Sequence, residues 1–168
     1  MSVLGTMSVL GSNEYMTMRE WHRAIIGGRD VILRHTSALV HLQLFSGYVH
    51  DAGVEVYAKQ PVQQPMEMGH SEMYSAEIGN NGFIYNIVDS FDGIDYVNIR
   101  DVRCTSINQT INDMLGCGAN MDVQALVEAL SRYYYTNNNS FDGLYINPEN
   151  MERFNSLKDW AVEYYDEG

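Results

Sequence analysis

The sequence predicts an α+β protein: two N-terminal helices, then a small, mainly antiparallel sheet of about four strands, then a C-terminal group of three helices. Near the N-terminus and after residue 104, apolar residues recur every three or four positions, which is typical of amphipathic helices. Between these regions they alternate or form short runs rich in β-branched and aromatic residues, which is typical of strands. Strands grouped together favour α+β over repeated βαβ units.

The chain has 168 residues, of which 45% are hydrophobic, and this is enough to form one packed core. The first segment repeats itself, because Met1–Gly5 has the same five residues as Met7–Gly11. No period continues after this duplication. We therefore expect residues 1–15 to be a flexible leader and residues 16–168 to form a single α+β domain.

The first predicted helix has signals at both ends. Thr17 and Glu20 have the spacing of a capping box, in which each side chain bonds the other residue's backbone amide. Trp21 and Ile25 are four positions apart and share one face of the helix. Gly27 is suited to end it.

The second predicted helix follows a short apolar run at residues 31–33. Thr36 or Ser37 can cap its N-terminus with a hydroxyl group, and Gly47 marks its expected end.

The predicted strands lie between residues 54 and 104. Residues 54–58 alternate, residues 83–88 have the strongest strand composition, and residues 94–99 alternate cleanly. The short link at residues 90–93 predicts an antiparallel hairpin between the last two. Residues 102–104 either extend the last strand or begin another.

Three helices are predicted after the strands. Thr105 or Ser106 opens the first, which ends at Gly116. Asp122 caps the second. The third begins at Asn147–Glu149, where a capping Asn is followed by a proline and an acid.

The chain is strongly acidic, with 22 acidic against 10 basic residues and a formal net charge of −12. Residues 60–128 hold ten acids but only Arg100 and Arg103 as bases. Such a charge repels phosphate backbones, which argues against direct DNA binding. The excess serves solubility or forms an acidic face that docks a basic partner. No apolar run approaches the ~18 residues that a membrane span needs, and no secretory signal is seen, so we expect a cytoplasmic protein without a membrane partner.

The sequence contains no motif typical of a catalytic, metal-binding or cofactor-binding site. Cys104 and Cys117 are expected to be free thiols, with a single bridge as the alternative. The glycines on either side of Cys117 indicate a helix end and not a phosphate loop. The five histidines lack the spacing of metal ligands. We therefore predict no catalytic residue, no metal and no cofactor. The alternative is a small enzyme whose site is built from scattered acids or from Cys104.

Two groups of residues are candidates for partner binding. Three successive tyrosines cannot all face the core from one helix, since successive positions turn by ~100°, and exposed tyrosines are favoured binding anchors. Several aspartates cluster around the predicted hairpin. The candidates are Tyr133, Tyr134, Tyr135, Asp89, Asp92 and Asp95. The alternative for the tyrosines is that their rings pack on the protein and their hydroxyl groups face solvent. The alternative for the aspartates is a solvated acidic loop.

Residues 31–48, 94–99 and 102–115 together resemble the core domain of AbiEi-type antitoxins, from abortive-infection toxin–antitoxin systems. The shared features are a Ser-Ala-Leu helix near the start of the core, and later a strand that leads into a helix of the form Thr…Asp-Met-Leu. Residues 122–165 look like the closing helices of that family. The family usually carries an N-terminal winged helix-turn-helix, for which the residues before Arg29 are too few.

This resemblance implies a non-enzymatic protein that binds and neutralises or regulates a macromolecular partner, such as a nucleotidyltransferase-type toxin, in phage defence. A second hypothesis is an acidic inhibitor from a phage or mobile element that mimics nucleic acid and binds a nuclease. A homo-oligomer is compatible with either reading.

Overall fold

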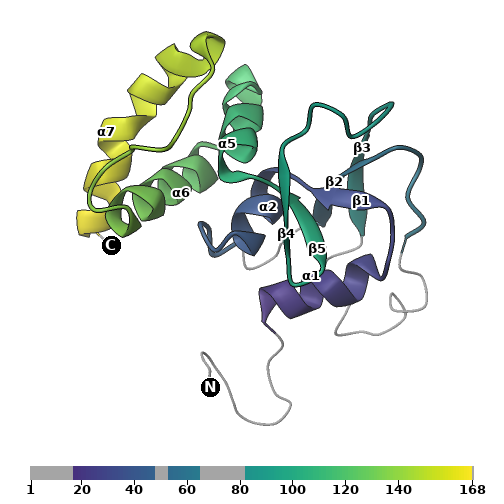
Figure 1. Cartoon of the computed structure of the whole chain (residues 1–168). Coiled ribbons are helices and arrows are strands. Elements are labelled where there is room, and N and C mark those ends of the chain that lie inside the picture. The colour runs from purple at the N-terminus through teal and green to yellow at the C-terminus, as the bar shows by residue number, and fades with distance from the viewer. Residues whose placement is uncertain (1–16, 48–52, 65–81, 168) are drawn as a thin grey trace, which may run out of the picture.

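The computed structural model describes residues 17–47, 53–64 and 82–167, and within them the chain is an α+β protein, as predicted. Helix α1 lies against a mixed sheet, and helices α5 to α7 gather at the other side of the molecule (Figure 1). The predicted leader, residues 1–15, lies outside the described residues. No helix in the described ranges is both long and apolar enough to cross a membrane.

The described sheet has five strands in the order β3-β2-β1-β5-β4. Their bounds are Val31–Leu33 (β1), Val54–Ala58 (β2), Phe83–Ile87 (β3), Tyr96–Ile99 (β4) and Val102–Thr105 (β5). Two neighbouring pairs are antiparallel, β1–β2 and β4–β5, and two are parallel, β1–β5 and β2–β3. The sheet is therefore mixed, not mainly antiparallel. The apolar run at residues 31–33 is its central strand, so a strand separates the first two helices.

The predicted hairpin between residues 83–88 and 94–99 is wrong. Strands β3 and β4 form the opposite edges of the sheet, and the chain crosses the whole sheet between them. The hairpin instead joins β4 to β5 through Arg100 and Asp101, whose φ angles are 56° and 66°. Two central residues with positive φ are the mark of a type I′ turn, which matches the twist of antiparallel strands.

This turn offers a stabilising substitution. Arg100→Asn with Asp101→Gly is expected to raise the free energy of unfolding by about 0.5–1 kcal/mol, because Asn and Gly adopt positive φ with less strain. The lost ion pair between Arg23 and Asp101 is highly exposed on both sides and contributes little. Urea denaturation of the double variant checks this, and an unchanged or lower stability would contradict it.

The first helix, α1 (Met18–Ile26), has both predicted ends. Thr17 accepts a bond from the Glu20 amide, Glu20 accepts one from the Thr17 amide, and Gly27 closes the helix with φ 53°.

Helix α2 (His35–His41) differs from its prediction at both ends. It starts after Arg34 without a side-chain cap and ends before Leu42, not at Gly47. The hydroxyl groups of Thr36 and Ser37 bond Glu55 of strand β2 instead, so they tie the helix to the sheet.

The C-terminal helices are α5 (Ile107–Leu115), α6 (Val123–Thr136) and α7 (Met151–Glu167). Ser106 and Asp122 cap α5 and α6 as predicted. Short 3-10 turns lie at Gly118–Asn120 (η1) and Pro148–Asn150 (η2). Asn147 precedes η2 but makes no side-chain cap, so the predicted helix start is a 3-10 turn that leads into α7.

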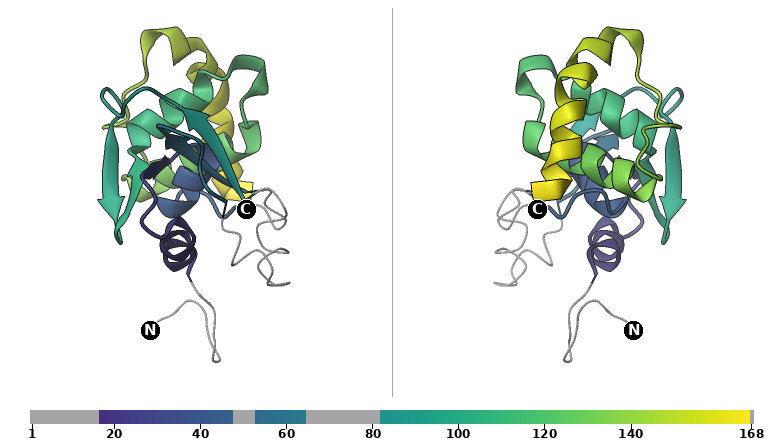
Figure 2. Two further views of the ribbon diagram at one scale, coloured as in Figure 1. Left: turned by 90° about the vertical axis from the view of Figure 1, so that its right-hand side faces the viewer. Right: turned by 90° about the vertical axis from the view of Figure 1, so that its left-hand side faces the viewer.

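The buried apolar residues in the described part of the chain form two hydrophobic cores. In the first, Ile25 and Ile26 of α1 cover one face of the sheet. The second core joins α2, α5, α6 and α7. Helix α2 serves both, because Ala38 belongs to the first and Leu39 to the second. Figure 2 shows α1 apart from the C-terminal helices, so α2 and the sheet connect the two halves.

A buried histidine pair reinforces the first half. The Nδ1 atoms of His22 (α1) and His41 (α2) are 3.0 Å apart, and His41 Nε2 lies 2.9 Å from the Ile99 carbonyl of β4. The His41 Nε2–H donates to that carbonyl, so His41 Nδ1 accepts from His22. Burial and the neighbouring ring lower the pKa of His22 to about 3, and burial also lowers the pKa of His41. Both rings are therefore neutral near neutral pH.

Candidate functional site

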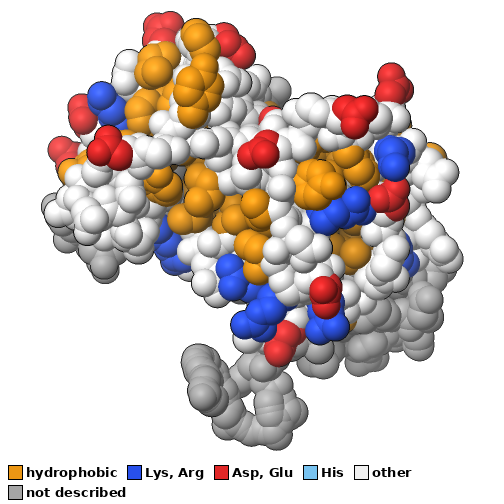
Figure 3. Space-filling view, viewed as in Figure 1, with side chains coloured by type: hydrophobic (Ala, Val, Ile, Leu, Met, Phe, Trp, Pro, Cys, Tyr) orange, Lys and Arg blue, Asp and Glu red, His pale blue; other side chains and the backbone are white. Residues whose placement is uncertain are grey.

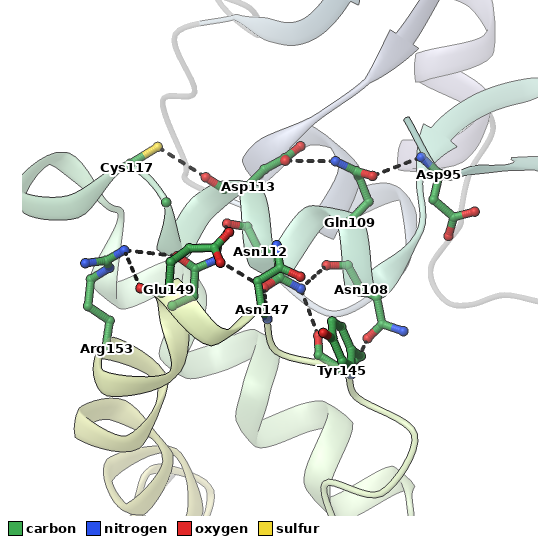
Figure 4. Close-up of a pocket in the computed structure, with 12 residues that line it drawn as sticks. Asp95, Asn108, Gln109, Asn112, Asp113, Cys117, Tyr145, Asn147, Glu149 and Arg153 are labelled. Carbon is green, nitrogen blue, oxygen red and sulfur yellow. Dashed lines mark hydrogen bonds between the residues drawn. The ribbon is translucent and has the colours of Figure 1, made fainter. Parts of the chain in front are cut away.

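A polar cleft of about 570 Å³ opens between α5 and the chain that leads into α7 (Figure 4). Most of the residues that line it carry an amide, carboxylate or guanidinium group. The lining residues are Asp95, Asn108, Gln109, Asn112, Asp113, Gly116, Cys117, Tyr145, Asn147, Glu149, Asn150 and Arg153. Many of these lie one helical turn apart on α5, where spacings of three and four place side chains on one face.

Asn112 anchors the back of the cleft and is 9% exposed. Its Nδ2 donates to the carbonyls of Asn108 and Tyr145, both at 2.8 Å. Its Oδ1 accepts from the Asn147 amide at 2.8 Å and from Asn150 Nδ2 at 3.1 Å. The Asn112 amide thus makes four hydrogen bonds, two as a donor and two as an acceptor, which is its full capacity. Asn112 thereby fastens the 145–150 segment to α5.

Arg153 continues this framework from α7. Its Nε donates to the Leu115 carbonyl at 2.6 Å, and its Nη2 donates to Asn150 Oδ1 at 3.0 Å. A carbonyl at the end of α5 thereby gains a cationic donor, which favours the helix terminus. The floor of the cleft is thus held by bonds between three separate segments.

The carboxylates of the cleft make fewer hydrogen bonds than the amide groups of this framework. Asp113 accepts from the Tyr57 hydroxyl at 2.7 Å and from Gln109 Nε2 at 2.9 Å. Burial and the Asp113 carboxylate raise the pKa of Tyr57, so its proton stays in this bond. Asp95 and Glu149 are exposed, and Tyr145 is 60% exposed. Three carboxylates and one guanidinium therefore line a cleft that has an aromatic ring at its rim.

Next to Cys117 of the cleft lining lies a group of residues whose proximity the sequence analysis did not predict. The Cys117 Sγ is 3.9 Å from His35 Nε2, and His35 Nδ1 is 3.3 Å from Glu55 Oε1. Burial alone would raise the pKa of Glu55, but the bonds from His35 and Thr36 outweigh it and lower that pKa. Arg34 Nη2 also lies 2.9 Å from His35 Nε2. These residues are far apart in sequence, so no local motif signals them.

The three predicted tyrosines pack along α6. The Tyr133 hydroxyl donates to the Asp142 carbonyl at 2.6 Å, and the Tyr135 hydroxyl donates to the Val162 carbonyl at 2.7 Å. The Tyr134 ring contacts Tyr135 and Phe141. All three side chains are half-buried and cover neighbouring segments. Their role as partner anchors stays a prediction.

The three predicted aspartates, Asp89, Asp92 and Asp95, are all exposed on the segment that joins β3 to β4. Of these, only Asp95 lines the cleft, where its backbone amide donates to Gln109 Oε1 at 2.9 Å. The other two serve as charge-matched comparisons for it. On the face shown in Figure 3 the carboxylates are scattered among apolar and basic side chains and form no continuous acidic patch.

Both cysteines are free, but their settings differ. Cys104 is fully buried in the sheet, and burial raises its pKa to about 12, whereas Cys117 is partly exposed in the cleft lining. Within the described ranges no three His, Cys, Asp or Glu side chains are placed to hold a metal ion. Comparisons with protein-family models, with curated proteins and with solved structures give no match.

Proposed function

We propose that this chain is a non-enzymatic, antitoxin-like protein that binds a macromolecular partner and neutralises or regulates it. The observation that carries the proposal is the acidic cleft with the exposed Tyr145 at its rim. Complementary charge steers and orients a partner, while a rim aromatic supplies contact area.

The chemistry of the cleft selects a basic segment of that partner. Asp95 and Glu149 are exposed and free to meet an incoming Lys or Arg side chain, and Tyr145 offers a ring face for a cation–π contact. The amide framework behind them already fastens the backbone at Tyr145 and Asn147 to α5, so the segment that carries Tyr145 and Glu149 is in place before a partner arrives. The same charges repel nucleic acid phosphates.

The resemblance to AbiEi-type antitoxins suggests which partner to test. A nucleotidyltransferase-type toxin encoded beside the gene for this chain is the first candidate, because an enzyme that handles nucleotides presents basic residues at its own site. Occupation of those residues by the acidic cleft would block substrate binding.

The test is co-expression with that neighbouring gene, followed by calorimetry of the purified pair. We expect growth rescue by the native chain and a loss of affinity of about tenfold or more in Asp95→Asn with Glu149→Gln. The matched control is Asp89→Asn with Asp92→Asn, which removes the same charge outside the cleft lining and is expected to change affinity by less than about threefold.

Tyr145→Ala is expected to weaken the complex by about 1–3 kcal/mol without altering its salt dependence, because it removes contact area and no charge. Equal losses in the two charge variants would show that net charge and not the cleft is recognised. No growth rescue and no complex with the product of the neighbouring gene would overturn the proposal. Binding to a nuclease in competition with DNA would instead support the nucleic-acid mimic.

A further inference from the structure

Cys117, in the link between α5 and η1, lies beside His35 of α2, and His35 lies beside Glu55 of β2. A thiol beside an imidazole that is itself oriented by a carboxylate is the arrangement that activates a nucleophile. The Sγ–Nε2 distance of 3.9 Å is at the loose end of this geometry, as is common before a substrate is present.

The hydrogen bonds define which nitrogen of His35 is the base. Arg34 Nη2 can only donate, so at 2.9 Å it requires a lone pair on His35 Nε2. Nδ1 therefore carries the proton and donates it to Glu55. The Cys117 thiol donates to the Asp113 carbonyl at 3.5 Å and lies 3.9 Å from His35 Nε2. For the transfer, the thiol hydrogen turns from that carbonyl to Nε2 and the guanidinium shifts away from the same lone pair.

The backbone of His35 supports a special role. Its φ is 52°, in the left-handed region that few residues other than glycine adopt. Such a conformation persists only where surrounding contacts hold it, and it places the imidazole between Arg34, Glu55 and Cys117.

We propose that Cys117 is a site of covalent modification, a nucleophilic thiol that forms mixed disulfides with small cationic disulfides that enter the cleft. This goes beyond partner binding and does not depend on it. Cys104 cannot share the role, because it is buried in the sheet.

The reaction is a balanced thiol–disulfide exchange. The Cys117 proton passes to His35 Nε2, and the thiolate attacks one sulfur of the incoming disulfide. One S–S bond forms at Cys117 and the S–S bond of the reagent breaks. The departing thiolate takes the proton from His35 and leaves as a thiol. The incoming disulfide is the oxidant, and it is reduced to one free thiol.

The preference for a cationic reagent follows from the walls of the cleft. Asp113, Glu149 and Asp95 line the same cleft as Cys117, and among the described residues of that lining Arg153 alone is basic. A cleft of about 570 Å³ accommodates a small hydrophilic molecule. A reagent with ammonium groups is attracted there, while one with several carboxylates is repelled.

The test measures the rate of mixed-disulfide formation on the folded chain by intact mass and peptide mapping. Three reagents are compared: cystamine, which is cationic, 2-hydroxyethyl disulfide, which is neutral, and glutathione disulfide, which is anionic. We expect modification at Cys117, at least about tenfold faster with cystamine than with glutathione disulfide. The chain unfolded in urea gives the rate of a Cys117 thiol without the folded site, and the preference for cystamine that net charge alone produces. We expect both the rate at Cys117 and the preference for cystamine to be smaller in urea than in the folded chain.

Matched variants separate the parts of the site. Cys117→Ser should abolish the modification, and Cys104→Ser should leave it unchanged. His35→Asn should slow it by about tenfold or more, and Asn tolerates the positive φ at this position. Glu55→Gln should slow it less, because the base remains but its orientation weakens.

Ser156→Ala serves as the remote control. Ser156 is exposed on α7 and contacts neither Cys117 nor His35 nor Glu55, so this variant should leave the rate within about twofold of the native rate. Circular dichroism of each variant shows that it is folded, and if His35→Asn is not, Glu55→Gln decides. A Cys117 rate no faster than in urea, a rate unaffected by both the His35 and Glu55 variants, or no preference for cystamine beyond that in urea would overturn the proposal. None of these results bears on the partner-binding test.

Discussion

Replacing Asn112 with alanine is expected to lower the free energy of unfolding by about 3 kcal/mol. The substitution leaves the Asn147 amide and the Tyr145 carbonyl without their side-chain partner, around a residue that is only 9% exposed. Asn150 Nδ2 loses one of its two bonds but still donates to the Asn112 backbone carbonyl. Each polar group left without a partner costs about 1–3 kcal/mol when water cannot replace the bond. The small cavity adds to this loss.

Urea denaturation followed by circular dichroism measures the effect. Asn155→Ala on the exposed face of α7 is the comparison, and it should change stability by less than about 0.5 kcal/mol. If Asn112→Ala lowered the free energy of unfolding by no more than Asn155→Ala does, the 145–150 segment would not depend on the Asn112 side chain. The framework of the cleft would then need another explanation.

Mild acid is expected to remove about 2 kcal/mol of stability between pH 6.5 and about pH 5 through His22 alone. The folded state holds the pKa of His22 at about 3, against an ordinary value of 6.5. Below pH 6.5 the unfolded chain therefore binds a proton at this residue that the folded chain does not. The contribution is fully present above pH 6.5 and falls as pH drops towards 3. The lowered pKa of His41 acts in the same direction.

Stability curves at several pH values check this. The window above about pH 5 isolates the histidines, because Asp30 and Glu55 have pKa values below their ordinary 3.8 and 4.5 and lose their contributions only in stronger acid. His22→Phe should be less stable at neutral pH, because it leaves His41 Nδ1 without a donor, yet it should show a shallower slope. A slope as steep as that of the native chain would contradict the assignment.

Local signals in the sequence predicted the helix ends where a side chain acts on its own turn. The Thr17–Glu20 capping box, Gly27, Ser106 and Asp122 all behave as their chemistry predicts. The start of α2 could not be found this way, because Thr36 and Ser37 bond a strand about twenty positions away and leave the helix end uncapped.

Strand positions were predictable from alternation, but strand neighbours were not. Residues 83–87 and 96–99 both form strands, yet a period of two does not reveal which edge each strand joins. The pairing of β4 with β5 depends on positive φ at Arg100 and Asp101, residues that carry no sequence signal for such a turn. The short link at residues 90–93 therefore predicted a hairpin between β3 and β4, whereas the hairpin joins β4 to β5.

The cleft was beyond sequence reasoning for the same reason. Of the residues proposed as partner contacts, only Asp95 lies in its lining. The others in the lining come from α5, the link that follows it, the 145–150 segment and α7, and Asn112 and Asn147 look like ordinary polar residues in isolation. Likewise, Cys117 and His35 are 82 positions apart, so their proximity arises only in the folded chain.

The central place of β1 has a consequence for synthesis on the ribosome. Its antiparallel neighbour β2 follows soon after it, but its parallel neighbour β5 begins only at Val102. Until then one edge of a fully apolar strand is bare and open to pairing with other chains. Nascent chains released early should therefore aggregate or be captured by chaperones, and the yield of active protein should depend on how quickly translation passes Thr105.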